Sequence, residues 1–132
     1  MSADRSGDLG HPVALSAVTL HVADMARAVG FYDALGFERI YGGPDDRFTS
    51  YAIAGAFLNL MLDQDGTGDG SGPRRWGRVI VHVDDVDAMH RRVVGAGAVP
   101  HDDPRDAPGG ERFFHVNDPD GHELSFARPL TP

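Results

Sequence analysis

An internal repeat constrains this chain more than any other feature. Residues 20–24, Leu-His-Val-Ala-Asp, match residues 81–85, Val-His-Val-Asp-Asp. Gly36 and Gly97 follow at the same distance from the last aspartate of each segment. A repeat of this kind usually means that one unit cannot bury its apolar face alone and packs against its twin. The alternative is chance similarity between two ordinary strand–helix units.

Each half of the chain has the periodicity of one strand, one helix and three further strands. Apolar residues alternate with polar ones in the strands and recur at helical spacing in the helices. Asp24 and Asp85 suit the N-cap position, and Gly36 and Gly97 suit the helix ends. The predicted helices are residues 24–35 and 85–94. The predicted strands are residues 14–22, 38–41, 47–53, 57–62, 78–83, 98–100, 112–116 and 123–127.

Segments rich in glycine and aspartate separate these units. Residues 1–10 are predicted to form a flexible tail that precedes one domain, residues 11–132. Residues 63–77 are predicted to be an exposed linker between module one, residues 14–62, and module two, residues 78–128.

Two polar segments punctuate module two. Residues 101–110 are rich in proline and glycine and are predicted to be a loop between strands. The sequence Asp118-Pro119-Asp120-Gly121 has turn chemistry, because proline fixes φ, aspartate bonds its own backbone and glycine accepts positive φ. It predicts that the chain ends in a hairpin.

Composition excludes several classes of protein. The chain has 132 residues, which is about one domain, and it has no cysteine for disulfides or thiolate metal sites. No apolar run reaches the length of a membrane span, and the polar N-terminus lacks a signal-peptide core. The net charge of −8 argues against nucleic acid and anionic membranes as partners. We therefore expect a cytoplasmic protein.

The doubled unit, together with three local motifs, resembles the vicinal oxygen chelate superfamily of glyoxalases, bleomycin-resistance proteins and extradiol dioxygenases. The motifs are Phe31-Tyr32, Leu35-Gly36-Phe37 and Asp118-Pro119-Asp120-Gly121. The resemblance implies an α+β fold of two βαβββ modules that form a curled mixed sheet with a concave ligand cleft and helices on the outside. It also implies a homodimer. One fold carries several chemistries in this superfamily, so the resemblance does not settle the function.

The chain departs from the superfamily's metal enzymes at the positions that the resemblance marks as metal ligands. These positions hold Ala17, Asn59, Arg78 and Ser125. A divalent ion needs neutral histidine or carboxylate, and none of the four residues supplies either. We therefore predict no metal. The alternative is one divalent metal ion on a displaced set, His21, His82 and Glu123.

Strand alternation places six polar residues on one face of their strands, the resemblance adds Asn59, and the resemblance also implies that these faces line the cleft. The candidate ligand-binding residues are Thr19, His21, Asn59, Arg78, His82, Glu123 and Ser125. Arg78 is expected to replace the metal as the positive charge. Four aromatic residues could add stacking surface: Tyr51, Phe57, Trp76 and Phe113. The other histidines are interpreted as structural or solvated: His11, His90, His101, His115 and His122.

Two function classes remain open. The first is a metal-free protein that binds a small aromatic or anionic molecule without turnover. The second is a lyase, isomerase or dioxygenase that uses the displaced metal set, or His21 and His82 as acid and base. The sequence assigns no catalytic residue.

Overall fold

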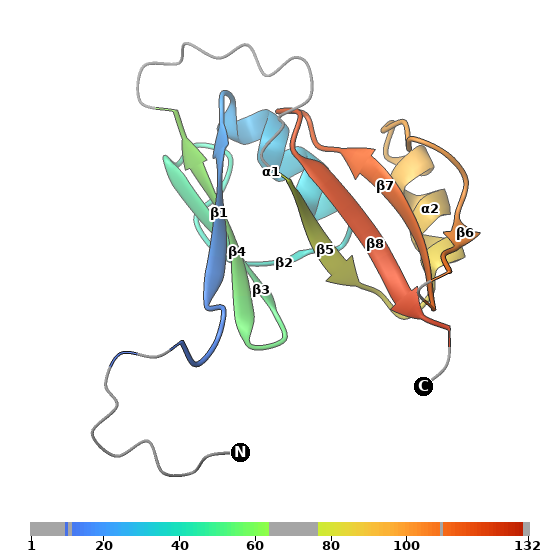
Figure 1. The fold of residues 1–132 in the computed structure, drawn as a ribbon. Coiled ribbons are helices and arrows are strands. Elements are labelled where there is room, and N and C mark those ends of the chain that lie inside the picture. Colours follow the sequence, from blue (N-terminus) through green and yellow to red (C-terminus); the bar gives the residue numbers. More distant parts are fainter. Residues whose placement is uncertain (1–9, 11, 64–76, 109, 131–132) are drawn as a thin grey trace.

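A computed structural model describes residues 10, 12–63, 77–108 and 110–130, and these fold as two modules with the same order of elements (Figure 1). Module one consists of β1 (Ala17–Val22), α1 (Met25–Ala34), β2 (Glu38–Tyr41), β3 (Phe48–Ile53) and β4 (Ala56–Leu62). Module two consists of β5 (Arg78–His82), α2 (Val86–Gly95), β6 (Arg105–Asp106), β7 (Glu111–Asn117) and β8 (Glu123–Pro129).

Each module forms its own four-stranded sheet, and the two sheets have the same topology. The strand orders are β1-β4-β3-β2 and β5-β8-β7-β6. In each sheet the first strand pairs with the fourth in parallel, and the remaining neighbours are antiparallel. This confirms the repeat and the α+β class. The predicted curl of the sheets stays a prediction.

The helix boundaries follow from the residues that the sequence singled out. The Asp24 carboxylate accepts a hydrogen bond from the Arg27 backbone N–H at 3.0 Å, and Asp85 caps α2 in the same way. Gly36 and Gly97 have φ of 88° and 91°, a left-handed conformation that favours glycine after a helix. The predicted caps and stops are therefore confirmed in both modules.

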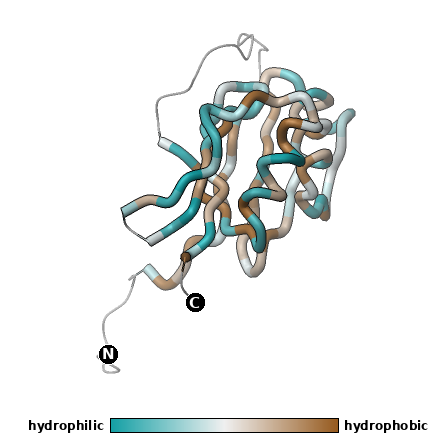
Figure 2. The backbone as a smooth tube through the Cα atoms, turned by 90° about the vertical axis from the view of Figure 1, so that its right-hand side faces the viewer, coloured by the Kyte–Doolittle hydropathy of each residue, from teal (hydrophilic) through white to brown (hydrophobic). Residues whose placement is uncertain are grey.

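The core lies between each helix and the sheet that it covers. Along β1, Leu20 and Val22 are buried while Thr19 and His21 are exposed, as the alternation predicted. Figure 2 shows brown and teal alternating along the helices and strands, as amphipathic elements require. The two modules share one apolar cluster, and Phe37 of module one packs against Phe126 of module two with ring centroids 6.2 Å apart.

The turn between β7 and β8 is a buried polar structure. One carboxylate oxygen of Asp118 accepts hydrogen bonds from the backbone N–H groups of Asp120 and His122. The other accepts one from the Tyr32 hydroxyl on α1, at 2.8 Å. Burial raises the pKa of both Asp118 and Tyr32. The predicted hairpin is confirmed, and its turn also binds module one.

Two further residues of this turn bind the end of β1 and the start of α1. Asp120 accepts hydrogen bonds from the Ala23 backbone N–H at 2.7 Å and from the Arg27 guanidinium at 3.1 Å. The His122 ring bonds the backbone carbonyl of His21 at 2.8 Å. We call residues 118–122 the clasp, because the side chains of Asp118, Asp120 and His122 join module two to module one.

One predicted strand is wrong. Residues 98–100 form no strand, because the Ala98 N–H still bonds the Val93 carbonyl of the preceding helix and Pro100 has no N–H to donate. The strand that completes this sheet at its edge is β6, within the segment that was predicted to be a loop. It pairs with Arg112 and Phe113 of β7.

The predicted limits of the tail and the linker fall largely on residues outside the described ranges. β4 ends at Leu62 and β5 begins at Arg78, but residues 64–76 of the predicted linker and residues 1–9 of the predicted tail lie outside the described ranges. None of the helices in the described ranges is long and apolar enough to cross a bilayer.

Candidate functional site

Each sheet has one face covered by its helix and a second face, which we call the open face. Alternation along the strands places all seven candidate ligand-binding residues on the open faces. On the first sheet, Ser50 donates to Asn59 at 2.7 Å, and Asn59 donates to Thr19 at 3.3 Å. This chain of neutral groups crosses three neighbouring strands, and its centre is polar without being charged.

The open face of the second sheet carries charge instead. Arg78 and Glu123 are ladder partners on β5 and β8, and Arg78 Nε donates to a Glu123 carboxylate oxygen at 2.6 Å. The side chains are 47% and 24% exposed, so this ion pair remains in contact with solvent. Among the described residues, Nε is the only guanidinium nitrogen of Arg78 with a hydrogen-bond partner. The outer nitrogens can therefore still donate to a ligand.

His115 joins this pair, although the sequence predicted it to be structural or solvated. It is the ladder partner of Ser125, which is buried, and its Nδ1 lies 3.9 Å from the Glu123 carboxylate. That nitrogen is buried without a hydrogen-bond partner in the described structure. Burial, and then the charge of Arg78, lower the pKa of His115, so the ring is neutral at pH 7.

The sequence contained a signal that could have placed His115. Phe114 and Val116 are apolar residues at alternate positions, and the position between them holds His115. In the structure both apolar residues are fully buried. Choosing these two as the helix-facing positions sets the register and puts His115 on the opposite face. Phe113 is also apolar, so periodicity alone does not decide between the two facings of this strand.

The alternative metal set is not assembled in the described structure. His21 lies 3.3 Å from Asp63, and His82 lies 2.9 Å from Glu111, so the two histidines face different carboxylates. Glu123 is held by Arg78, which precedes His82 by four residues, or roughly 13 Å along a strand. The described residues contain no group of three histidine, cysteine, aspartate or glutamate side chains arranged to hold a metal.

The usual ligand positions also do not suit a divalent ion. Ala17 has no donor atom and pairs with Phe57, so the corresponding part of the first open face is apolar. Asn59 is engaged by Ser50 and Thr19, and a permanent cation occupies position 78. The donor set at these positions does not fit the superfamily's metal.

An apolar groove lies on the surface between the first and second sheets. It has a volume of about 220 Å³, and its walls include Ala17 and Phe57 from module one and Ile80 and His82 from module two. Phe57 is 41% exposed and Ile80 is 59% exposed, so large apolar side chains face solvent here. The groove therefore offers apolar contact next to the charged face.

The four aromatic residues that were predicted to stack on a ligand lie in different places. Phe57 lines the groove, and Phe113 lies on the second open face with the Arg105 guanidinium 4.6 Å from its ring centre. The prediction for Tyr51 is wrong. Tyr51 is fully buried on the helix side, where its hydroxyl donates to Asp33 at 2.9 Å. Trp76 lies outside the described residues.

The structure also places His90 and His101, two of the histidines that were predicted to be structural or solvated. His90 packs edge-on against Phe114 with ring centroids 5.0 Å apart, which places it against the sheet. His101 bonds the Asn117 side chain at 3.0 Å and lies beside His115. The second open face thus holds His115 in addition to His82, which was the only histidine predicted there.

These features agree with the comparison to known proteins. Residues 14–126 match the Glyoxalase/Bleomycin resistance protein/Dioxygenase superfamily, and the chain belongs to that superfamily. Uncharacterized proteins of Mycobacterium bovis and Mycobacterium tuberculosis are 33% identical over 123 residues. The alignment covers 84% of this chain and 80% and 72%, respectively, of those proteins.

Solved structures support the same assignment. TioX from Micromonospora sp. ML1 is 28% identical and aligns with a TM-score of 0.71, over 89% of this chain and all of TioX. The bleomycin resistance determinant encoded on the transposon Tn5 is 18% identical with a TM-score of 0.69. That alignment covers 89% of this chain and 98% of the determinant, and it shows a shared fold alone.

Proposed function

We propose that this protein binds a small molecule on its open faces and does so without a metal at the superfamily's usual position. The observation that carries the proposal is the Arg78–Glu123 ion pair, which stands where a metal ligand would be required. An arginine at that position repels a metal but donates hydrogen bonds to an anionic or carbonyl oxygen.

The neighbouring groove indicates the shape of the ligand. Ile80 lines the groove and follows Arg78 by two residues, which is roughly 7 Å along the strand. One small molecule could therefore contact the outer nitrogens of Arg78 and place an apolar or aromatic part against Phe57. This combination favours an aromatic molecule with a carboxylate, phenolate or carbonyl group.

The test compares 1-naphthoate with naphthalene-1-methanol by calorimetry. Naphthoate should bind more tightly, and Arg78→Ala should remove the difference. Arg78 is half exposed and already paired, so we expect a loss of about 1 kcal/mol, the scale of an exposed ion pair. Arg39→Ala is the matched control, because Arg39 forms an exposed pair with Asp33 in the other module. Equal binding by the Arg78 variant and the native protein would contradict the proposal.

Metal addition provides an independent test of the same proposal. Zn²⁺, Mn²⁺ and Fe²⁺ should each leave the melting temperature unchanged, because a bound metal would stabilise the folded state by mass action. Stoichiometric metal in the purified protein, or an activity abolished by a chelator, would instead support an enzyme of the same superfamily.

A homodimer is part of the proposal. β1 and β5 are the outer strands of their sheets, and exposed apolar side chains line the groove between the sheets, including Leu15 at 85% exposure. Such a surface is commonly covered by a partner. Light scattering should give twice the chain mass of 14.2 kDa, and the monomer mass at micromolar concentration would contradict this.

A further inference from the structure

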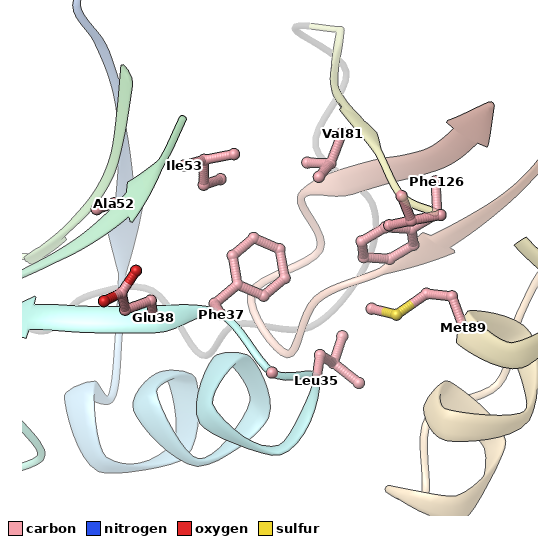
Figure 3. A pocket seen from close by; sticks show the side chains of 10 residues that line it. Leu35, Phe37, Glu38, Ala52, Ile53, Val81, Met89 and Phe126 are labelled. Atoms are coloured by element: carbon pink, nitrogen blue, oxygen red, sulfur yellow. The ribbon is translucent and has the colours of Figure 1, made fainter. Parts of the chain in front are cut away.

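A second cavity lies between the modules on the side of the helices (Figure 3). Its volume is about 300 Å³, at the lower end of the range for small-molecule sites. Leu35, Phe37 and Glu38 line it from module one, and Val83, Met89 and Phe126 line it from module two. We call it the junction cavity. It is distinct from the groove of the proposed function, although Ile53 and Val81 line both.

The lining is apolar except at one end. Figure 3 shows Glu38 beside Ala52 at one end, Met89 and Phe126 at the other, and the Phe37 ring between them. Glu38 is the only ionisable residue in the lining, and its carboxylate has no hydrogen-bond or ion-pair partner among the described residues. The neighbouring Arg39 does not neutralise it, because its guanidinium bonds both carboxylate oxygens of Asp33.

The chemistry of these groups selects for positive charge. A carboxylate attracts a cation directly, the faces of phenylalanine rings attract cations through their quadrupole, and the polarizable thioether of Met89 adapts to aromatic partners. The net charge of −8 also raises the local concentration of cations around the protein. A permanent cation also lies nearby, because the Arg92 guanidinium stands against Gly36 and its Nε donates to the Ala34 carbonyl at the end of α1. Its charge opposes that of Glu38, so probes of opposite charge distinguish the two residues.

We propose that the junction cavity binds a small amphipathic cation, an arylalkylamine of one or two rings, with its ring against Phe37 and Met89 and its ammonium group towards Glu38. The apolar walls lose water on binding, at about 25 cal/mol for each Å² of apolar surface, and the carboxylate orients the charged end. The site is independent of Arg78 and Glu123.

The test uses three probes that differ only in their polar end: 4-phenylbutylamine, 4-phenyl-1-butanol and 4-phenylbutyrate. The amine should bind about two- to fivefold more tightly than the alcohol, the range for one exposed ion pair, and the acid should bind most weakly. The Met89 methyl resonance should shift on binding. Glu38→Gln should bring the amine to the affinity of the alcohol, and Val83→Phe should weaken all three probes by filling the cavity.

Two controls separate this site from the proposed function and from net charge. Glu111→Gln removes one exposed carboxylate elsewhere and should keep the preference for the amine. Phe57→Ala alters only the groove and should also keep it, whereas it should weaken naphthoate. The proposal is overturned by equal binding of amine and alcohol, by tightest binding of the acid, or by saturation without a shift at Met89. Tightest binding of the acid would point to Arg92 instead.

Discussion

The two modules share their strand order and helix caps, yet corresponding pairs of residues on neighbouring strands have opposite chemistry. We call such a pair of residues a rung. The first rung between β1 and β4 pairs Ala17 with Phe57, and the first rung between β5 and β8 pairs Arg78 with Glu123. An apolar pair in one sheet thus corresponds to an ion pair in the other. The helix-facing halves of both modules are apolar because they form the core, and the open faces are free of that requirement.

The hairpin turns also differ between the modules. In module one, Ile53 pairs with Ala56, so Ala54 and Gly55 alone connect β3 to β4. In module two, residues 118–122 connect β7 to β8 and reach α1 of the other module. The short turn closes a hairpin locally, whereas the clasp contributes to the contact between modules. The second module therefore carries both the charged face and the polar link.

Removing Asp118 should have the largest effect on stability. Asp118→Ala leaves the Tyr32 hydroxyl and the backbone N–H groups of Asp120 and His122 buried without their acceptor. Each buried unsatisfied group costs about 1–3 kcal/mol, so the free energy of unfolding should fall by about 3 kcal/mol or more. Urea unfolding monitored by circular dichroism measures it.

The same experiment tests whether the modules unfold together. Because the clasp holds α1, Asp118→Ala should lower the midpoint of a single transition. Tyr32→Phe is the control, since it removes one donor and keeps the ring packing, and it should cost about 1 kcal/mol. An Asp118→Ala protein as stable as the native one would show that the clasp does not join the modules energetically.

Replacing the charged pair of module two by the apolar pair of module one should change ligand binding more than it changes the free energy of folding. The double variant Arg78→Ala/Glu123→Phe gives module two the pair of module one. The ion pair is partly exposed, so its loss should cost less than about 1 kcal/mol of folding free energy. The preference for naphthoate over naphthalene-1-methanol should disappear in calorimetry. If the double variant kept that preference, the charge difference between the modules would have no role in ligand binding.

The helix-facing parts of the fold were predictable because short-range rules determine them. Asp24 and Asp85 begin helices through bonds to the next turn, and Gly36 and Gly97 end them through positive φ. Residues 98–100 were mispredicted as a strand because the Ala98 N–H bonds the Val93 carbonyl at the end of α2, a contact that periodicity does not contain.

The open faces were less predictable because strand pairing decides which residues meet. Arg78 and Glu123 were each predicted to face the site, but their contact depends on a register between strands that are 45 residues apart. Tyr51 was predicted on the wrong side of its sheet, since an aromatic residue in a strand can either stack on a ligand or fill the core. Its hydroxyl bond to Asp33 allows it to be buried.

His115 should make the stability of module two depend on pH. Its pKa is lowered in the folded state, so below its ordinary value of about 6.5 the unfolded chain binds a proton that the folded chain does not. This contribution to stability is present above about pH 6.5 and is lost as the pH falls through the folded pKa. Between pH 7.5 and 5.5, the melting temperature of the native protein should fall further than that of the His115→Gln variant.

Arg78 should account for part of that shift. Arg78→Ala removes the second-largest cause of the lowered pKa and leaves Glu123, which raises it. The pKa of His115 should therefore rise, as measured from the pH dependence of its ring proton resonances. Ser50 occupies the matching position in module one and cannot titrate in this range, so the dependence belongs to the second sheet. An unchanged pKa in the variant would contradict the proximity of these groups.

The smallest expected effect lies in the short turn of module one. Ala54 has φ of 44° and Gly55 has φ of 84°, the positive pair that a two-residue hairpin turn requires. Alanine in the left-handed region costs about 1 kcal/mol, whereas asparagine tolerates it. Ala54→Asn should therefore stabilise the protein by about 0.5–1 kcal/mol, or about 2–5 °C in melting temperature. Ala96→Asn is the control, because Ala96 has φ of −83° and gains nothing from asparagine. Equal effects of the two substitutions would show that the turn is unstrained and that the modules do not differ in this respect.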